Sequence, residues 1–236
     1  MKIRLAFLVG LLASLWCAAA YAQTYKPFPG ATSDPRTIRL QESVDELYVA
    51  GNFERALFIY EKDLAPQGDK YAQYMVGYMY LHAQGVQQDK AKALAWYRLA
   101  TERGESVLQA PQRKLIETMS PAEIARANSI LAELRDSIGD MKLIADLIKQ
   151  DLNILKQRTG SRVPRSDFSG PLIILRPTGG TMGPNYYHDV RVRLEVRLSY
   201  LETRVEISDV ALQIDDEDFK LLQEQAKSEL AALDQQ

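Results

Sequence analysis

Four side chains at helical spacing are the first candidates for binding chemistry. Tyr71, Tyr74, Tyr78 and His82 recur every three or four residues in YAQYMVGYMYLH, which places them on one face of a helix. Tyrosine combines a large rigid ring with a hydroxyl group and is enriched at interface hot spots. Two interpretations follow: the stripe binds a protein or peptide partner, or another part of the chain covers it.

The other residues that could do chemistry do not form a catalytic or metal-binding motif. The two histidines, His82 and His188, have no set of spaced ligands around them. The acidic run 215–218 lacks the spaced carboxylates and glycine of a calcium loop. The glycines of 179–183 are not followed by lysine and serine, and Ser106 lacks the second glycine of a nucleophile elbow. We therefore expect no catalytic residue, no metal and no cofactor.

The amino-terminal residues have the pattern of a secretory signal peptide. Lys2 and Arg4 precede an apolar run, 5–16, and the small-residue site AYA follows at 20–22. We expect cleavage after Ala22 and export to the periplasm. The apolar run is shorter than the roughly 20 residues that a membrane span needs, and an uncleaved anchor is the alternative.

The expected mature chain has 236 − 22 = 214 residues and a mild charge. The sequence holds 29 basic and 31 acidic residues. Two of the basic residues lie in the signal peptide, so the mature balance is 27 − 31 = −4. Such a balance argues against a nucleic-acid-binding protein. The one cysteine, Cys17, also lies in the signal peptide, which excludes disulfides and thiolate metal sites from the mature chain. We find no second apolar stretch that could span a membrane.

The middle of the chain contains an internal repeat of helical patterns. Residues 23–36 are rich in proline, glycine and small polar residues and predict a flexible leader. Helical patterns then occupy 37–159, where RALFIY at 55–60 recurs as KALAWY at 92–97, an offset of 37 residues. A period of this length made of two helices is typical of an α-solenoid. We predict a mostly α fold, an α-α superhelix formed by a short solenoid of helical hairpins, with 106–159 as its helical cap.

Residues 72–104 resemble a Sel-one-like repeat, a relative of the tetratricopeptide repeat. The matching residues are small, aromatic, capping or turn-forming: Ala72, Gly77, Tyr80, Gly85, Val86, Asp89, Lys92, Ala93, Trp96, Tyr97, Ala100 and Gly104. The preceding unit, 38–68, resembles a degenerate copy. Position 83 departs from the family pattern, because Ala83 stands where the family usually has glycine. The chain also looks like a group of exported proteobacterial proteins of this type without an assigned activity.

The carboxyl-terminal residues change character twice. Residues 160–185 are rich in glycine and proline and predict a linker. The next segment, 187–202, alternates like a strand, yet it also carries a helical stripe of Tyr187, Val190, Leu194, Leu198 and Leu201. We favour the helix, then an extended arm over 204–214 and a last helix over 215–233. The segment 186–236 is therefore expected to be small, mainly helical and less regular.

These observations favour a binding function over catalysis. We expect a non-enzymatic periplasmic repeat protein that acts as a scaffold or adaptor for a protein or peptide partner. One alternative is an enzyme that acts on the cell envelope, such as a peptidoglycan hydrolase. The other is a structural module that self-associates through 186–236.

Overall fold

The computed structural model describes residues 28–30, 35–104, 106–156, 174–175, 181–182, 186–207 and 216–234. These residues are almost entirely helical, which confirms the mostly α fold. A short antiparallel pair joins β1 (Ile174–Leu175) to β2 (Thr181–Met182). No helix in the described part is long and apolar enough to cross a membrane. The predicted signal peptide and its cleavage site lie outside the described residues.

The helices follow one another with short connections through the first two thirds of the chain. In chain order they are α2 (Pro35–Val49), α3 (Phe53–Ile59), the π-helical turn η1 (Tyr60–Leu64), the 3₁₀ turn η2 (Ala65–Gln67), α4 (Lys70–Leu81), α5 (Lys90–Ala100), α6 (Ser106–Ile116), α7 (Pro121–Ile138), α8 (Asp140–Lys156), α9 (Tyr186–Ile207) and α10 (Asp216–Asp234).

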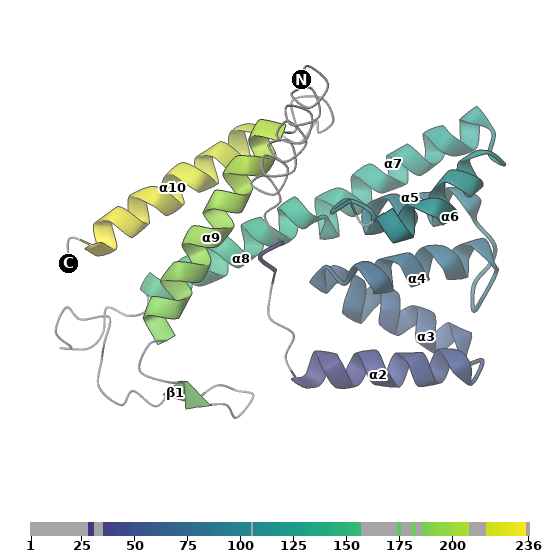
Figure 1. Ribbon diagram of the computed structural model, residues 1–236, viewed down its shortest axis with the longest axis horizontal. Coiled ribbons are helices and arrows are strands. Elements are labelled where there is room, and N and C mark those ends of the chain that lie inside the picture. Colours follow the sequence, from purple (N-terminus) through teal and green to yellow (C-terminus); the bar gives the residue numbers. More distant parts are fainter. Residues whose placement is uncertain are drawn as a thin grey trace, which may run out of the picture.

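The helices pack into two cores (Figure 1). The first core is built from α2 to α7, and the second from α8, α9 and α10. We predicted 106–159 as the helical cap of the repeats. Within that range, the apolar residues Ile144, Ile148 and Leu155 of α8 are buried in the second core. Helix α8 therefore carries the second core, and the domain boundaries drawn from the sequence stay predictions.

Small residues let α4 and α5 pack closely against each other. A Cβ atom on Gly77 would lie 2.8 Å from the Tyr97 ring and 3.1 Å from the carbonyl oxygen of Ala93. Each helix begins at an aspartate whose side chain accepts a backbone N–H bond: Asp69 from Ala72 and Asp89 from Lys92. Such caps satisfy amide groups that have no partner inside the helix. The predicted cap at Asp89 is confirmed.

One predicted cap does not form. Asn52 precedes α3 but makes no side-chain capping bond. Its backbone has φ −80° and ψ 64°, outside the extended conformation that Asp69 and Asp89 adopt. By contrast, Ser120 and Glu123 form the predicted capping box at the start of α7.

Helix α4 is apolar on most of its surface because neighbours cover it on two sides. It packs against α3, η1 and η2 on one side and against α5 on the other. Met75, Val76 and Met79 are buried between them. Gln73, also fully buried, donates from its Nε2 to the carbonyl oxygen of Ala65 and accepts from Lys70 Nζ. The high proportion of apolar residues in α4 therefore reflects its position inside the first core.

The segment 187–202 is a helix, as we favoured. Val190, Leu194, Leu198 and Leu201 of α9 are buried against α8 and α10. The predicted extended arm is wrong for 204–207, because α9 continues to Ile207. Adding residues to an existing helix requires no new nucleation. Residues 208–215 lie outside the described part.

The turn between α4 and α5 contains two left-handed residues. Gly85 has φ +68°, and a Cβ atom there would lie 2.5 Å from the backbone nitrogen of Glu54. Ala83 has φ +54°, a left-handed conformation that is unfavourable for any residue with a Cβ. This is the position at which the Sel-one-like pattern usually has glycine. Ala83 thus adopts a left-handed conformation, which glycine adopts without strain.

We predict that Ala83→Gly stabilises the protein. Removing the Cβ relieves the left-handed strain of about 1–2 kcal/mol, and the added freedom of the unfolded chain offsets part of that gain by about 0.4–1 kcal/mol. Urea denaturation should therefore show a rise of up to about 1.6 kcal/mol in the free energy of unfolding. The control is Ala125→Gly, at an exposed position inside α7, which should lower it by about 1 kcal/mol. An equal loss of unfolding free energy in both variants would show that Ala83 is not strained.

Candidate functional site

The predicted aromatic stripe forms one continuous face of α4, which we call the tyrosine surface: Tyr71, Tyr74, Tyr78 and His82. Tyr71 is 54% exposed, His82 is exposed, and Tyr74 and Tyr78 are half-buried. The Tyr74 and Tyr78 ring centroids are 6.4 Å apart, and those of Tyr78 and His82 are 4.2 Å apart. The rings thus form a row along the helix that neighbouring elements leave partly open.

The hydroxyl groups of this row are available for a partner. In the described part of the chain, the hydroxyls of Tyr71, Tyr74 and Tyr78 make no hydrogen bond to the protein. The Tyr60 hydroxyl, in contrast, donates to Asp45 Oδ1 at 2.7 Å. A phenolic hydroxyl is both donor and acceptor. The tyrosine surface therefore offers apolar rings together with unpaired polar groups.

Burial raises the pKa of two of these hydroxyls, those of Tyr71 and Tyr74. It is the main cause that raises the pKa of Tyr71, with the charge of Asp45 as the next largest. Burial likewise raises the pKa of Tyr74, and the neighbouring Tyr78 and Tyr48 add to the effect. Both hydroxyls therefore stay neutral hydrogen-bond donors at physiological pH.

Tyr48 of α2 is a neighbour of the surface that sequence analysis did not select. Its hydroxyl donates to Gln84 Oε1, in the turn after α4, at 2.9 Å. Its ring meets Phe53 edge-on, with centroids 5.3 Å apart. Tyr48 belongs to a different helix, so the spacing within 71–82 gave no signal for it. It fixes α2 beside the turn that carries His82.

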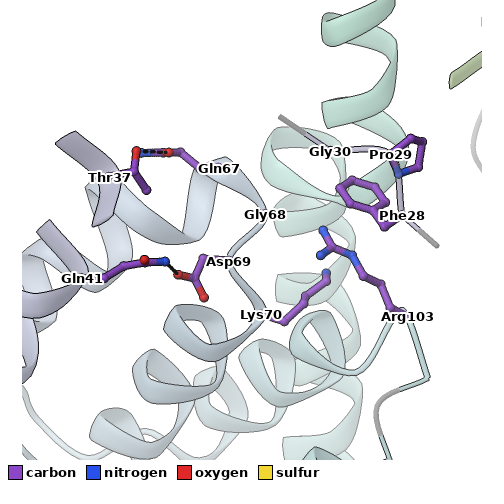
Figure 2. A pocket seen from close by; sticks show the side chains of 10 residues that line it. All are labelled: Phe28, Pro29, Gly30, Thr37, Gln41, Gln67, Gly68, Asp69, Lys70 and Arg103. Atoms are coloured by element: carbon purple, nitrogen blue, oxygen red, sulfur yellow. Dashed lines mark hydrogen bonds between the residues drawn. The ribbon is translucent and has the colours of Figure 1, made fainter. Parts of the chain in front are cut away.

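A second polar feature is a cluster of ion pairs near the junction of α7 and α8, and two of its members, Lys70 and Arg103, line a cleft of about 400 Å³ (Figure 2). Lys70 is 7% exposed and lies 3.1 Å from the Asp140 carboxylate and 3.5 Å from Glu102. Arg103 donates two bonds to Asp140, of 2.9 and 2.8 Å. Arg135 pairs with Glu102 at 2.7 Å. Because each cation has an acidic partner, this cluster joins helices rather than offering charge for catalysis.

The remaining residues considered from the sequence do not assemble into a site within the described ranges, and the glycines at 179, 180 and 183 lie outside them. His188 lies exposed in the first turn of α9, far along the chain from His82. Among the described residues, no group of three potential ligands could hold a metal ion. The acidic run lies mostly in α10, which begins at Asp216, as we expected for a helix start. Ser106 begins α6.

The comparisons with known proteins agree with this helical hairpin. Residues 70–105, which contain α4 and α5, match the family model described as Sel1 repeat. These residues form a Sel1 repeat. Sel1 repeats generally mediate protein–protein interaction. No curated protein and no solved structure matches the chain.

The floor of the tyrosine surface comes from the Sel1 repeat and the unit before it. Tyr97 of α5 is buried and stacks on Tyr74, with centroids 5.2 Å apart and a 30° interplanar angle. Tyr60, the equivalent residue of the preceding unit, is also buried and meets Tyr71 edge-on at 6.4 Å. The 37-residue offset that aligns Tyr60 with Tyr97 thus places one buried ring against Tyr71 and the other against Tyr74, the first two rings of the row. Packed from below, the exposed rings are held in place.

We predict that the hydroxyls of the tyrosine surface contribute nothing to folding. The double variant Tyr74→Phe, Tyr78→Phe keeps the rings and should change the free energy of unfolding by less than about 0.5 kcal/mol. The matched variant Tyr60→Phe loses the bond to Asp45 and should cost about 1–2 kcal/mol. Chemical denaturation measures both. A large loss in the double variant would show that the hydroxyls have partners within the protein.

We predict that Asp140 is required for stability. Asp140→Ala leaves Lys70 and Arg103 without their shared partner, and removing one side of a buried ion pair costs about 3–5 kcal/mol. The control is Asp136→Ala, at an exposed position near the end of α7, with an expected change below about 0.5 kcal/mol. Thermal unfolding of both variants tests this. Similar melting temperatures would contradict the assigned role of Asp140.

Proposed function

We propose that this chain is a periplasmic, non-enzymatic adaptor that binds a segment of a protein partner on the tyrosine surface. The observation that carries the proposal is the row of Tyr71, Tyr74 and Tyr78. Their hydroxyls have no partner in the described part of the chain, and two buried tyrosines pack beneath the row. The interaction role general to Sel1 repeats supports it.

The rigidity of the surface favours binding. Rings that are already packed lose little conformational freedom when a partner docks, so more of the contact energy appears as affinity. The hydroxyls would bond to backbone groups or polar side chains of the partner, while its apolar side chains cover the rings. An extended or helical peptide with alternating apolar and polar groups would make both kinds of contact, hydrogen bonds to the hydroxyls and apolar contacts with the rings.

The periplasmic location rests on the sequence alone. The basic start, the apolar run and the small-residue site before Gln23 support export and cleavage. The non-enzymatic assignment rests on the sequence too, since no motif for a nucleophile, a metal site or a phosphate loop was found there.

Self-association is the second candidate, because α9 has an exposed apolar pair. Val192 and Val196 are 44% and 51% exposed and lie one turn apart on α9. They lie on the carboxyl-terminal segment for which the sequence predicted self-association. Capture of the chain by a second copy, independent of the tyrosine surface, would favour this candidate over the adaptor.

The test is partner capture with matched surface variants. We expect residues 23–236 to capture a periplasmic protein and Tyr71→Ser, Tyr78→Ser to bind it at least tenfold more weakly, a loss of about 1.4 kcal/mol or more. Phe58→Ser is the control, because Phe58 is 61% exposed on α3 and lies outside the surface. Circular dichroism should show that both variants remain helical. If the surface variant binds as well as the control, the tyrosine surface is not the binding site.

A further inference from the structure

Residues 28–30 of the predicted flexible leader contact both cores. The Arg103 guanidinium, which belongs to the first core, lies over the Phe28 ring, 3.6 Å from its centroid. Tyr200 of α9, which belongs to the second core, meets the same ring edge-on, with centroids 5.6 Å apart and an 84° interplanar angle. Both cation–π and edge-to-face contacts are attractive, because the ring has a negative face and a positive edge. One aromatic side chain thus contacts Arg103 of the first core and Tyr200 of the second.

A buried arginine holds the backbone that follows Phe28. Arg197 of α9 is 2% exposed. It donates to the carbonyl oxygens of Pro29 at 3.2 Å and of Gly30 at 3.4 Å. Its charge is balanced by the Asp151 carboxylate of α8, which is also buried. This arginine is therefore fixed in place before the segment binds, and it offers the carbonyl groups two charged donors.

Two glycines make room for this arrangement. A Cβ atom on Gly30 would lie 2.7 Å from the Phe28 ring, so the ring can fold back over its own chain only where residue 30 is glycine. A Cβ atom on Gly68 would lie 2.9 Å from Nη2 of Arg103 and 2.6 Å from the Leu143 side chain. Figure 2 shows Phe28 beside the Arg103 guanidinium, and both residues line the cleft together with Gly68.

We propose that Phe28–Pro29–Gly30 is an intramolecular clasp that binds between the two cores and fixes the first against the second. The chain connects the cores at the junction of α7 and α8, and the Asp140 ion pairs lie at that same junction. With a single attachment near one end of α8, the second core would be able to rotate relative to the first. The clasp adds a separate attachment on α9, through Tyr200 and Arg197, and so restricts that motion.

The test measures the distance between the cores with spin labels. In residues 23–236, which contain no cysteine, Glu42→Cys and Gln225→Cys place labels at exposed positions on α2 and α10. We expect one narrow distance distribution, and at least a twofold broader one after Phe28→Ala. Gly30→Ala should have the same effect while keeping the aromatic ring. Phe58→Ala is the matched control and should leave the width unchanged.

The outcomes distinguish a clasp between the two cores from a general loss of packing that any aromatic substitution would cause. Broadening in Phe28→Ala and Gly30→Ala, with the control unchanged, supports the clasp. Unchanged widths in both clasp variants would overturn it, because the α7–α8 junction would then be enough to fix the cores. Equal broadening in Phe58→Ala would overturn it too. Should Phe28→Ala fail to fold, Gly30→Ala decides by the same criterion.

Discussion

The Asp140 carboxylate is the interaction on which the arrangement of the two cores depends. It lies at the first residue of α8, where the helix dipole favours negative charge, and it pairs with Lys70 and Arg103 from the two ends of the Sel1 repeat. A buried carboxylate is costly unless it is paired and hydrogen-bonded. The start of α8 is thereby tied to the repeat, and α9 and α10 pack on α8.

The same repeat also gives the tyrosine surface its rigidity. Because α4 lies between η1 and α5, its methionines and small residues are used for packing. Only one face remains partly open, and Tyr60 and Tyr97 support that face from below. A repeat that stabilises itself by burying two faces of α4 therefore presents the third face as a fixed row of rings. This is how a structural repeat can act as a binding surface.

Local features of the fold could be predicted from the sequence. Apolar spacing located the helices, Asp89 and Ser120 capped theirs, and the 37-residue offset identified the repeat. The helical wheel also placed the tyrosines on one face of α4. The helices, the caps and the tyrosine face depend on residues within one or two turns of each other, and the repeat depends on a pattern that recurs along the chain.

Contacts between distant residues could not be predicted. Lys70 and Asp140 are 70 residues apart, and Phe28 and Tyr200 are 172 apart. Nothing in the local pattern of either residue indicates its partner. For the same reason α8 was assigned to the repeat cap, although its apolar stripe fits α9 as well as α7. Asn52 failed as a cap because its backbone conformation, and not its residue type, decides whether the bond forms.

The most direct test of the account is photocrosslinking from the tyrosine surface in living cells. A benzoylphenylalanine residue in place of Tyr78 keeps an aromatic ring on the half-buried face of α4, and one in place of Phe58 serves as the exposed control on α3. If a partner binds on the tyrosine surface, a discrete adduct with another protein forms from position 78 and none forms from position 58. Absence of an adduct at position 78, or the same adduct from both positions, would contradict it.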